Sequence, residues 1–197
     1  MPKRVDQDAR RRALAEAVFA VVGRRGIEGA GLRDVAAEAG VSMGSVQHWF
    51  RTKDEMLLFA LRHMRARVLA RLQAALEGLE NPTRRRTIAA GLGVMLPVDP
   101  PGREEAWVNI AFFSAAAANP AYAELLREGY SHLLGVSRAS LRATAEAGEL
   151  APGVDPVAEA TALFFLVQGL VGPVLVGVLD AGEARDVVEH QLDRLFR

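Results

Sequence analysis

The chain of 197 residues contains no cysteine, has few aromatic residues and carries no net charge. Without cysteine it can form neither a disulfide framework nor a thiolate metal site. Its four histidines also lack metal-ligand spacing, so no metal is expected at His48, His63, His132 or His190. The first residues, MPKRVDQDARRR, are basic but include no apolar segment of the secretory type. The expected location is therefore the cytoplasm.

The sequence also lacks the residue combinations of common enzyme sites. Ser131 and His132 are adjacent, so on a helix they point about 100° apart and cannot act together as nucleophile and base. The GLG segment at 91–93 has neither the strand nor the glycine spacing of a dinucleotide site. We therefore expect no enzymatic activity and no cofactor.

The zero net charge conceals an uneven distribution. Residues 1–86 contain 17 Lys and Arg against 10 Asp and Glu, whereas residues 87–197 contain 7 against 14. A basic N-terminal part favours the phosphate backbone of nucleic acid, and an acidic remainder tends to stay away from it. The pattern favours a nucleic-acid partner, although helical domains of other functions also differ in charge.

Residues 31–53, GLRDVAAEAGVSMGSVQHWFRTK, have the pattern of two short helices joined by a tight turn. Gly40 suits the strained backbone of such a turn, and Val41 is expected to fill the corner between the helices. Ser42 is a typical N-cap, while Val46 and Phe50, four residues apart, anchor the second helix to the first. The outward side of this helix is then small and polar, which fits a DNA major groove.

The segment from about Arg10 to Leu58 resembles the DNA-binding domain of the tetracycline-repressor (TetR) family of bacterial transcriptional regulators. The similar elements are RRRALAEAVFAVVGRRG, VAAEAGVSMGS, WF and TKDEML. Gly31 replaces the Thr that usually caps the second helix and touches phosphate, so that contact is expected to be lost. Gln47 replaces a common Tyr and is expected to alter a second phosphate contact.

Exposure and chemistry suggest two sets of DNA contacts. Candidates for the base edges and nearby phosphates are Met43, which suits a thymine methyl, Gly44, which allows close approach, Ser45, Gln47 and His48. Candidates for the phosphate backbone are Arg33, Ser42, Trp49, Thr52 and Lys53. Alternatives remain for some of them: Trp49 also fits half-buried packing, His48 a plain surface position, and Arg10, Arg11 and Arg12 either backbone contacts or a solvated helix face.

Helical periodicity recurs along the whole chain and no strand pattern competes with it. The predicted class is all-α with about nine helices. A three-helix helix-turn-helix domain is expected over residues 1–53 and a larger regulatory and dimerisation domain over 54–197, with 54–78 as a connecting helix. Thr52 and Glu55 are predicted to form a capping box at the start of that helix.

Residues 160–179, ATALFFLVQGLVGPVLVGVL, contain no charge and are long enough to cross a membrane. Gln168, three glycines, Pro173 and acidic flanks argue against a span, so we expect no membrane partner. The TetR resemblance implies instead that the last two helices form a homodimer interface. The Gly172-Pro173 step is expected to kink or loosen the helix. The sequence does not indicate a function for this step.

The later part of the chain is similar to the regulatory domain of choline-responsive TetR repressors, through AWVNIAFFSAAAANPAYAELL, Tyr130 and the GEL…DP…A…LVQGL pattern. The resemblance implies a ligand-binding domain, and quaternary ammonium groups favour aromatic faces. Candidate ligand residues are His63, Met64, Met95, Trp107, Phe112, Phe113, Tyr130 and Gln168, with Tyr122 beside them. The alternative is that these aromatics are ordinary core residues.

Together these observations predict a homodimeric transcriptional regulator, more consistent with a repressor, that binds palindromic double-stranded DNA. A small-molecule inducer of unknown identity is expected to release it. The alternative is a helical small-molecule-binding protein or enzyme without specific DNA binding.

Overall fold

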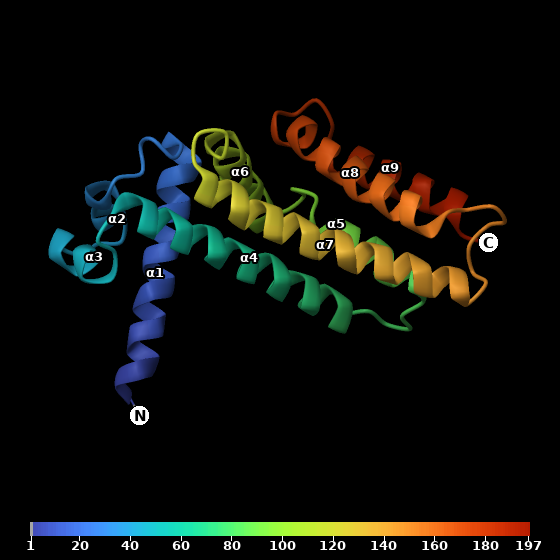
Figure 1. Ribbon diagram of the computed structural model, residues 1–197, viewed down its shortest axis with the longest axis horizontal. Coiled ribbons are helices and arrows are strands. Elements are labelled where there is room, and N and C mark those ends of the chain that lie inside the picture. Colours follow the sequence, from blue (N-terminus) through green and yellow to red (C-terminus); the bar gives the residue numbers. More distant parts are fainter. Residues whose placement is uncertain (1) are drawn as a thin grey trace. The chain divides into compact units, whose positions relative to one another are not determined.

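The computed structural model describes residues 2–197, with side chains from Ala9 onward (Figure 1). This part of the chain forms nine α-helices and no strand, which confirms the predicted all-α class. The helices are α1 (Pro2–Arg25), α2 (Leu32–Glu38), α3 (Met43–Trp49), α4 (Lys53–Glu77), α5 (Arg84–Val94), α6 (Pro100–Ala115), α7 (Pro120–Glu146), α8 (Pro156–Leu175) and α9 (Ala181–Leu195).

The first of two compact units contains the chain up to Arg67 together with Glu104–Leu126. Within it, α1, α2, α3 and the start of α4 form a small helical cluster, here called the head, in which α2 lies against both α1 and α3 (Figure 1). Phe19, Phe50 and Met56 are fully buried in the head because the apolar faces of its short helices converge on them.

The second unit contains Val68–Arg103 and Arg127–Arg197. In this unit α8 and α9 lie side by side, and α5 also packs against α9 (Figure 1). Its core is aliphatic, with buried side chains that include Ile88, Leu92, Leu141, Leu163, Val167, Val188 and Leu192. The chain leaves the first unit in the middle of α4 and returns to it for α6.

These units differ from the division expected at residue 53. The first unit extends along α4 to Arg67 and includes part of α6. Within it, Arg67 forms ion pairs with Glu16 of α1 and with Glu104 and Glu105 of α6. Phe112 of α6 is also completely buried. The helix-turn-helix is therefore part of a larger packed body than a three-helix domain.

The end of α8 explains the local effect of Pro173. Proline has no N–H, so Pro173 cannot donate a hydrogen bond to the carbonyl of Gly169. The helix ends two residues later, at Leu175. The Pro173 carbonyl accepts the N–H of Val178 at 2.9 Å, and Arg103 donates to the Leu175 carbonyl at 3.1 Å. The Gly172-Pro173 step thus lies in the last turn, where it helps to end the helix.

By length and composition alone, α8 is also the one helix within residues 2–197 that is long and apolar enough to cross a membrane. Part of its surface is buried in the core of the second unit, through Ala160, Leu163 and Val167. A helix that packs inside a protein core passes the same test, so this composition is weak evidence for a membrane span.

Candidate nucleic-acid interface and regulatory cavity

The turn between α2 and α3 holds the second helix in a fixed position. Gly40 has a φ of 64°, in the left-handed region that glycine adopts without strain. Val46 of α3 is buried as expected, and so is Phe50, the residue directly after α3. The expectation for Val41 was wrong: its side chain is 41% exposed. Its N–H donates to the Ala36 carbonyl at 3.0 Å, so its backbone closes the turn while its side chain faces outward.

The outward side of α3 is polar and accessible. Gly44, Ser45, Gln47 and His48 are exposed, whereas Met43 is half-buried. Because Val46 fixes the opposite side of the helix, these groups have defined positions from which to meet the edges of base pairs. The imidazole of His48 also packs edge-on against the indole of Trp49, with 5.4 Å between ring centroids.

A serine pair begins α3. The Ser42 hydroxyl accepts the backbone N–H of Ser45 at 3.1 Å, which confirms the predicted N-cap, and the two hydroxyl oxygens lie 2.9 Å apart. The mutual hydrogen bond orients both hydroxyl groups at the exposed start of the helix. This arrangement limits the directions in which either serine can bond to DNA.

The start of α4 presents two of the expected phosphate contacts. Thr52 accepts the N–H of Glu55 at 3.1 Å, as in a capping box, but the Glu55 carboxylate accepts the N–H of Arg51 rather than that of Thr52. Lys53 donates to the carbonyl of Glu28 at 2.9 Å, which uses one of its three N–H donors. The same ammonium group lies 3.8 Å from the Glu28 carboxylate, so a phosphate that bonds to Lys53 shares its charge with Glu28.

The other flank lies on α2 and its entry. Arg33 is exposed and so remains a candidate phosphate contact. Gly31 has no side chain with which to cap α2, and its own N–H donates to the Asp34 carboxylate at 3.2 Å. The Thr hydroxyl expected at this position in the family has no replacement here.

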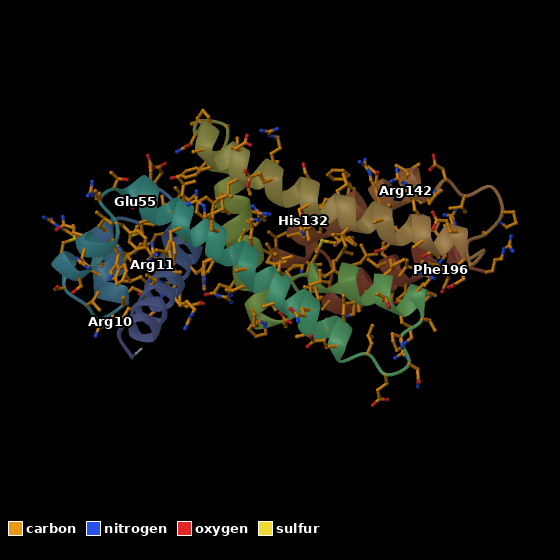
Figure 2. The ribbon with its side chains drawn as sticks, turned by 60° about the horizontal axis from the view of Figure 1, so that its bottom comes forward. Arg10, Arg11, Glu55, His132, Arg142 and Phe196 are labelled. Atoms are coloured by element: carbon orange, nitrogen blue, oxygen red, sulfur yellow. The ribbon has the colours of Figure 1, made fainter. Side chains whose placement is uncertain are left out.

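Arg11 also takes part in the packing of the head. The sequence left open whether it contacts the DNA backbone or lies on a solvated helix face. Its guanidinium lies over the rings of Trp49 and Phe59, 5.4 and 5.1 Å from their centroids, and Figure 2 shows it on α1 within the head. The contact helps to hold the half-buried Trp49 against the head. The sequence holds a partial signal, because Arg11 lies three residues before the apolar Leu14 and so shares a side of the helix with it.

The candidate ligand residues are divided between the two units. In the first unit, Met64 is buried, and Phe112 is packed edge-on against Tyr122, which supports the alternative that these rings are core residues. Trp107 and Phe113 of α6 are 42% and 62% exposed.

His63 also belongs to the first unit. Its ring makes a 3.0 Å hydrogen bond with Glu16 and lies 5.8 Å from the Phe19 ring. It thus connects α4 to α1.

Tyr122 links the start of α7 to the start of α4. Its hydroxyl donates to the Asp54 carboxylate at 2.9 Å, one residue after Lys53. Burial raises the pKa of Tyr122 well above its ordinary value, and the hydrogen bond to Asp54 and the charges of Asp54 and Glu28 raise the pKa further. The phenol therefore stays protonated and keeps its bond to α4 across the physiological pH range.

The remaining candidates, Met95, Tyr130 and Gln168, do come together in the second unit. The Tyr130 hydroxyl donates to the Gln168 amide oxygen at 3.2 Å, and the Gln168 amide nitrogen lies 3.7 Å from the sulfur of Met95. Tyr130 also packs edge-on against Phe164, with 5.9 Å between ring centroids. The polar amide expected to need a partner inside an apolar helix therefore has two within this unit.

Met95 also lines a cavity of about 90 Å³ in the second unit. The second half of α4, α5, α7 and the start of α8 provide its walls, through side chains that include Leu72, Ile88, Met95, Leu133, Val136 and Leu163. None of these lining residues except Met95 was among the sequence candidates. Leucine and valine on helix faces give no sequence signal that separates a cavity wall from a filled core.

Comparisons with known proteins agree with both parts of this arrangement. Residues 14–60 match the family model described as bacterial regulatory proteins, tetR family, and residues 84–197 match the model of the BetI-type transcriptional repressor C-terminal domain. The regulator PksA of Bacillus subtilis is 44% identical over 73 residues, which cover 37% of this chain and 36% of PksA. The match thus spans only about a third of that relative.

Two solved structures are similar over nearly the whole chain. A transcriptional regulator from Rhodococcus sp. RHA1 is 33% identical, with 93% of this chain and 94% of that chain covered and a TM-score of 0.79. A regulator from Saccharomonospora viridis, solved with choline, is 23% identical with coverages of 96% and 99% and a TM-score of 0.87. At that identity, the second comparison supports the fold alone.

Proposed function

The chain belongs to the TetR family of bacterial regulatory proteins, and from that premise we propose that it is a sequence-specific DNA-binding repressor released by a small-molecule ligand. The observation that carries the proposal is α3. Its inner side is fixed by Val46, and its outer side presents Ser45, Gln47 and His48 to solvent. A short helix held in this way can enter the major groove while its polar groups reach the bases.

The phosphate contacts of the proposal lie on both sides of α3. Arg33 precedes the turn, while Thr52 and Lys53 follow the helix at the start of α4. The hydrogen bond from Lys53 to the Glu28 carbonyl holds the Lys53 ammonium group in a fixed position, from which it is proposed to contact a phosphate. Contacts of this kind set the register of the helix on DNA but do not read the sequence.

The proposed active form is a homodimer through α8 and α9. Along α8 one stripe remains exposed at helical spacing and is small or apolar: Ala158, Ala162, Phe165 and Gly169, continued by Val176 directly after the helix. Phe165 is 52% exposed and Val176 67% exposed, which is costly in water and is relieved by a second copy. Two copies would place two α3 helices about 34–36 Å apart, to match successive major grooves of a palindrome.

The ligand is proposed to bind the second unit and to favour a spacing of the heads that no longer matches the operator. DNA and ligand must then reduce each other's equilibrium affinity by the same factor. Choline, found in the structurally similar regulator, is one test ligand. The Tyr130 and Phe164 rings are the aromatic faces of this unit that lie beside Gln168.

The proposal is tested by selecting binding sites from a random duplex library with the purified chain at near-physiological salt. The expected result is an enriched palindrome with half-sites about one helical turn apart, bound by a dimer in sedimentation measurements. A folded protein that enriches no sequence would contradict the proposal and favour a helical ligand-binding protein without DNA specificity.

A further inference from the structure

The cavity of the second unit has a distinctive lining. Thirteen of its sixteen lining residues are aliphatic, glycine or methionine, and no aromatic ring and no charged side chain is among them. The three polar members are Thr87, Ser137 and Ser140. The Thr87 hydroxyl donates its hydrogen to the Thr83 carbonyl at 2.9 Å within α5. The other two polar lining residues, Ser137 and Ser140, are both on α7.

This lining does not suit a cation. A quaternary ammonium is recognised by aromatic faces or by carboxylates, and moving a charge into aliphatic surroundings without such partners is strongly unfavourable. The ring pair of Tyr130 and Phe164 lies outside the lining, and so does every Asp and Glu of the second unit. An uncharged apolar group, by contrast, gains free energy wherever it replaces water against these walls.

The cavity is also elongated. Its lining runs from Val68 to Leu76 on α4, from Thr87 to Met95 on α5 and from Leu133 to Leu141 on α7. Each run covers nine residues, whose eight rises amount to about 12 Å along a helix axis. A length of this size combined with a volume of about 90 Å³ describes a narrow channel. Such a channel fits a linear chain better than a compact head group.

Gly91 and Val136 are two structural features that keep the channel open. At Gly91 the side chain is absent where α5 faces α4, and a methyl group there would lie 3.6 Å from the Leu72 side chain. On α7, Val136 lines the channel and is 45% exposed, so one apolar residue of the lining also contacts solvent.

We infer that this channel binds an unbranched aliphatic chain that carries a neutral oxygen, such as an alcohol or ester, within reach of Ser137 and Ser140. The inference deepens the proposed function, because it names the ligand class of the regulatory unit. It also separates this channel from a choline-type site, although residues 84–197 match the BetI-type model.

The test measures binding of 1-octanol and of choline chloride to the full chain by titration calorimetry and by the shift in melting temperature, without DNA. Gly91→Leu fills the channel from α5, and Ser140→Leu fills it from α7. Gly93→Leu is the matched control, because Gly93 lies two residues away on the same helix, outside the lining, with no atom within 4 Å of its added Cβ. Melting curves without ligand identify any variant that fails to fold.

The expected result is that octanol binds the wild type and the Gly93→Leu variant similarly, whereas Gly91→Leu and Ser140→Leu lower its affinity about tenfold or more. Failure of octanol to bind the wild type would overturn the inference. Octanol binding that is undiminished in both Gly91→Leu and Ser140→Leu would also overturn it. The same holds if choline binds the wild type and only these two variants lose choline binding. Because DNA is absent, octanol binding without an enriched operator would instead refute the proposed function and leave the inference intact.

Discussion

Replacing Arg67 by methionine is expected to destabilise the first unit more than the loss of an ordinary surface ion pair. The Arg67 guanidinium lies 2.6 Å from Glu16, 3.1 Å from Glu104 and 3.3 Å from Glu105, and it also covers the Phe19 ring at 5.1 Å. The Glu105 side chain is only 6% exposed, so its charge is costly to bury and Arg67 is one of the groups that stabilise it. Methionine retains the apolar stem but removes the charge.

The magnitude follows from how deeply each carboxylate is buried. Glu16 and Glu104 are 50% and 38% exposed, and exposed pairs of this kind contribute up to about 1 kcal/mol. Removing the partner of a buried charge costs about 3–5 kcal/mol. Because Arg67 is itself 20% exposed, we expect a loss near the lower end of that range, about 3 kcal/mol. In a chain of this size that loss lowers the melting temperature by about 6–12 °C.

Urea unfolding followed by far-ultraviolet circular dichroism measures the loss. Arg85→Met is the matched control, because Arg85 pairs with Glu189 and Asp193, which are 48% and 67% exposed. The control is expected to cost less than about 1 kcal/mol. Adding Glu105→Leu to Arg67→Met should recover most of the stability, since no buried charge then remains. Equal costs for Arg67→Met and Arg85→Met, or no recovery in the double variant, would refute the reasoning.

Three further predictions concern other parts of the chain. Lys53→Ala should weaken binding to all DNA sequences alike and make the dependence of log affinity on log salt shallower by about one unit, as measured by fluorescence anisotropy at several salt concentrations; an unchanged slope would contradict a phosphate contact. Phe165→Asp should raise the dimer dissociation constant at least about a hundredfold in sedimentation equilibrium, because it buries a carboxylate against its copy; an unaltered dimer would place the interface elsewhere. In a Tyr130→Phe background, tyrosinate absorbance should appear only well above pH 10, and the stability that protonated Tyr122 provides should be intact below about pH 10 and decline as the pH rises towards its folded-state pKa. Titration near pH 10 with the fold intact would contradict the burial of Tyr122.

The helix-turn-helix was readable from the sequence because its signals are local. A glycine in the turn, a serine cap and two apolar residues four apart each constrain the backbone within one or two turns. Val41 was the exception. An apolar residue beside a turn suggests burial, but the direction of its side chain depends on how the turn closes, and here it points to solvent.

The regulatory part was less predictable because its signals are long-range. Aromatic residues on α6 and α7 were predicted together as ligand candidates; Phe112 and Tyr122 belong to the first unit, where they pack against each other, and Tyr130 belongs to the second. The local sequence does not indicate to which unit each of these rings belongs, since all three lie on apolar helix faces. The cavity itself is formed by ordinary leucines and valines, and only their arrangement in space distinguishes them from core residues.

The central claim is that the outward side of α3 reads a DNA sequence, and parallel site selections with the wild type, His48→Ala and Lys53→Ala test it most directly. The account predicts one palindrome for the wild type and for Lys53→Ala, with weaker binding by the latter. It predicts that His48→Ala changes the preferred base at one symmetric position of each half-site. Identical palindromes from all three proteins, or none from the wild type, would contradict the claim.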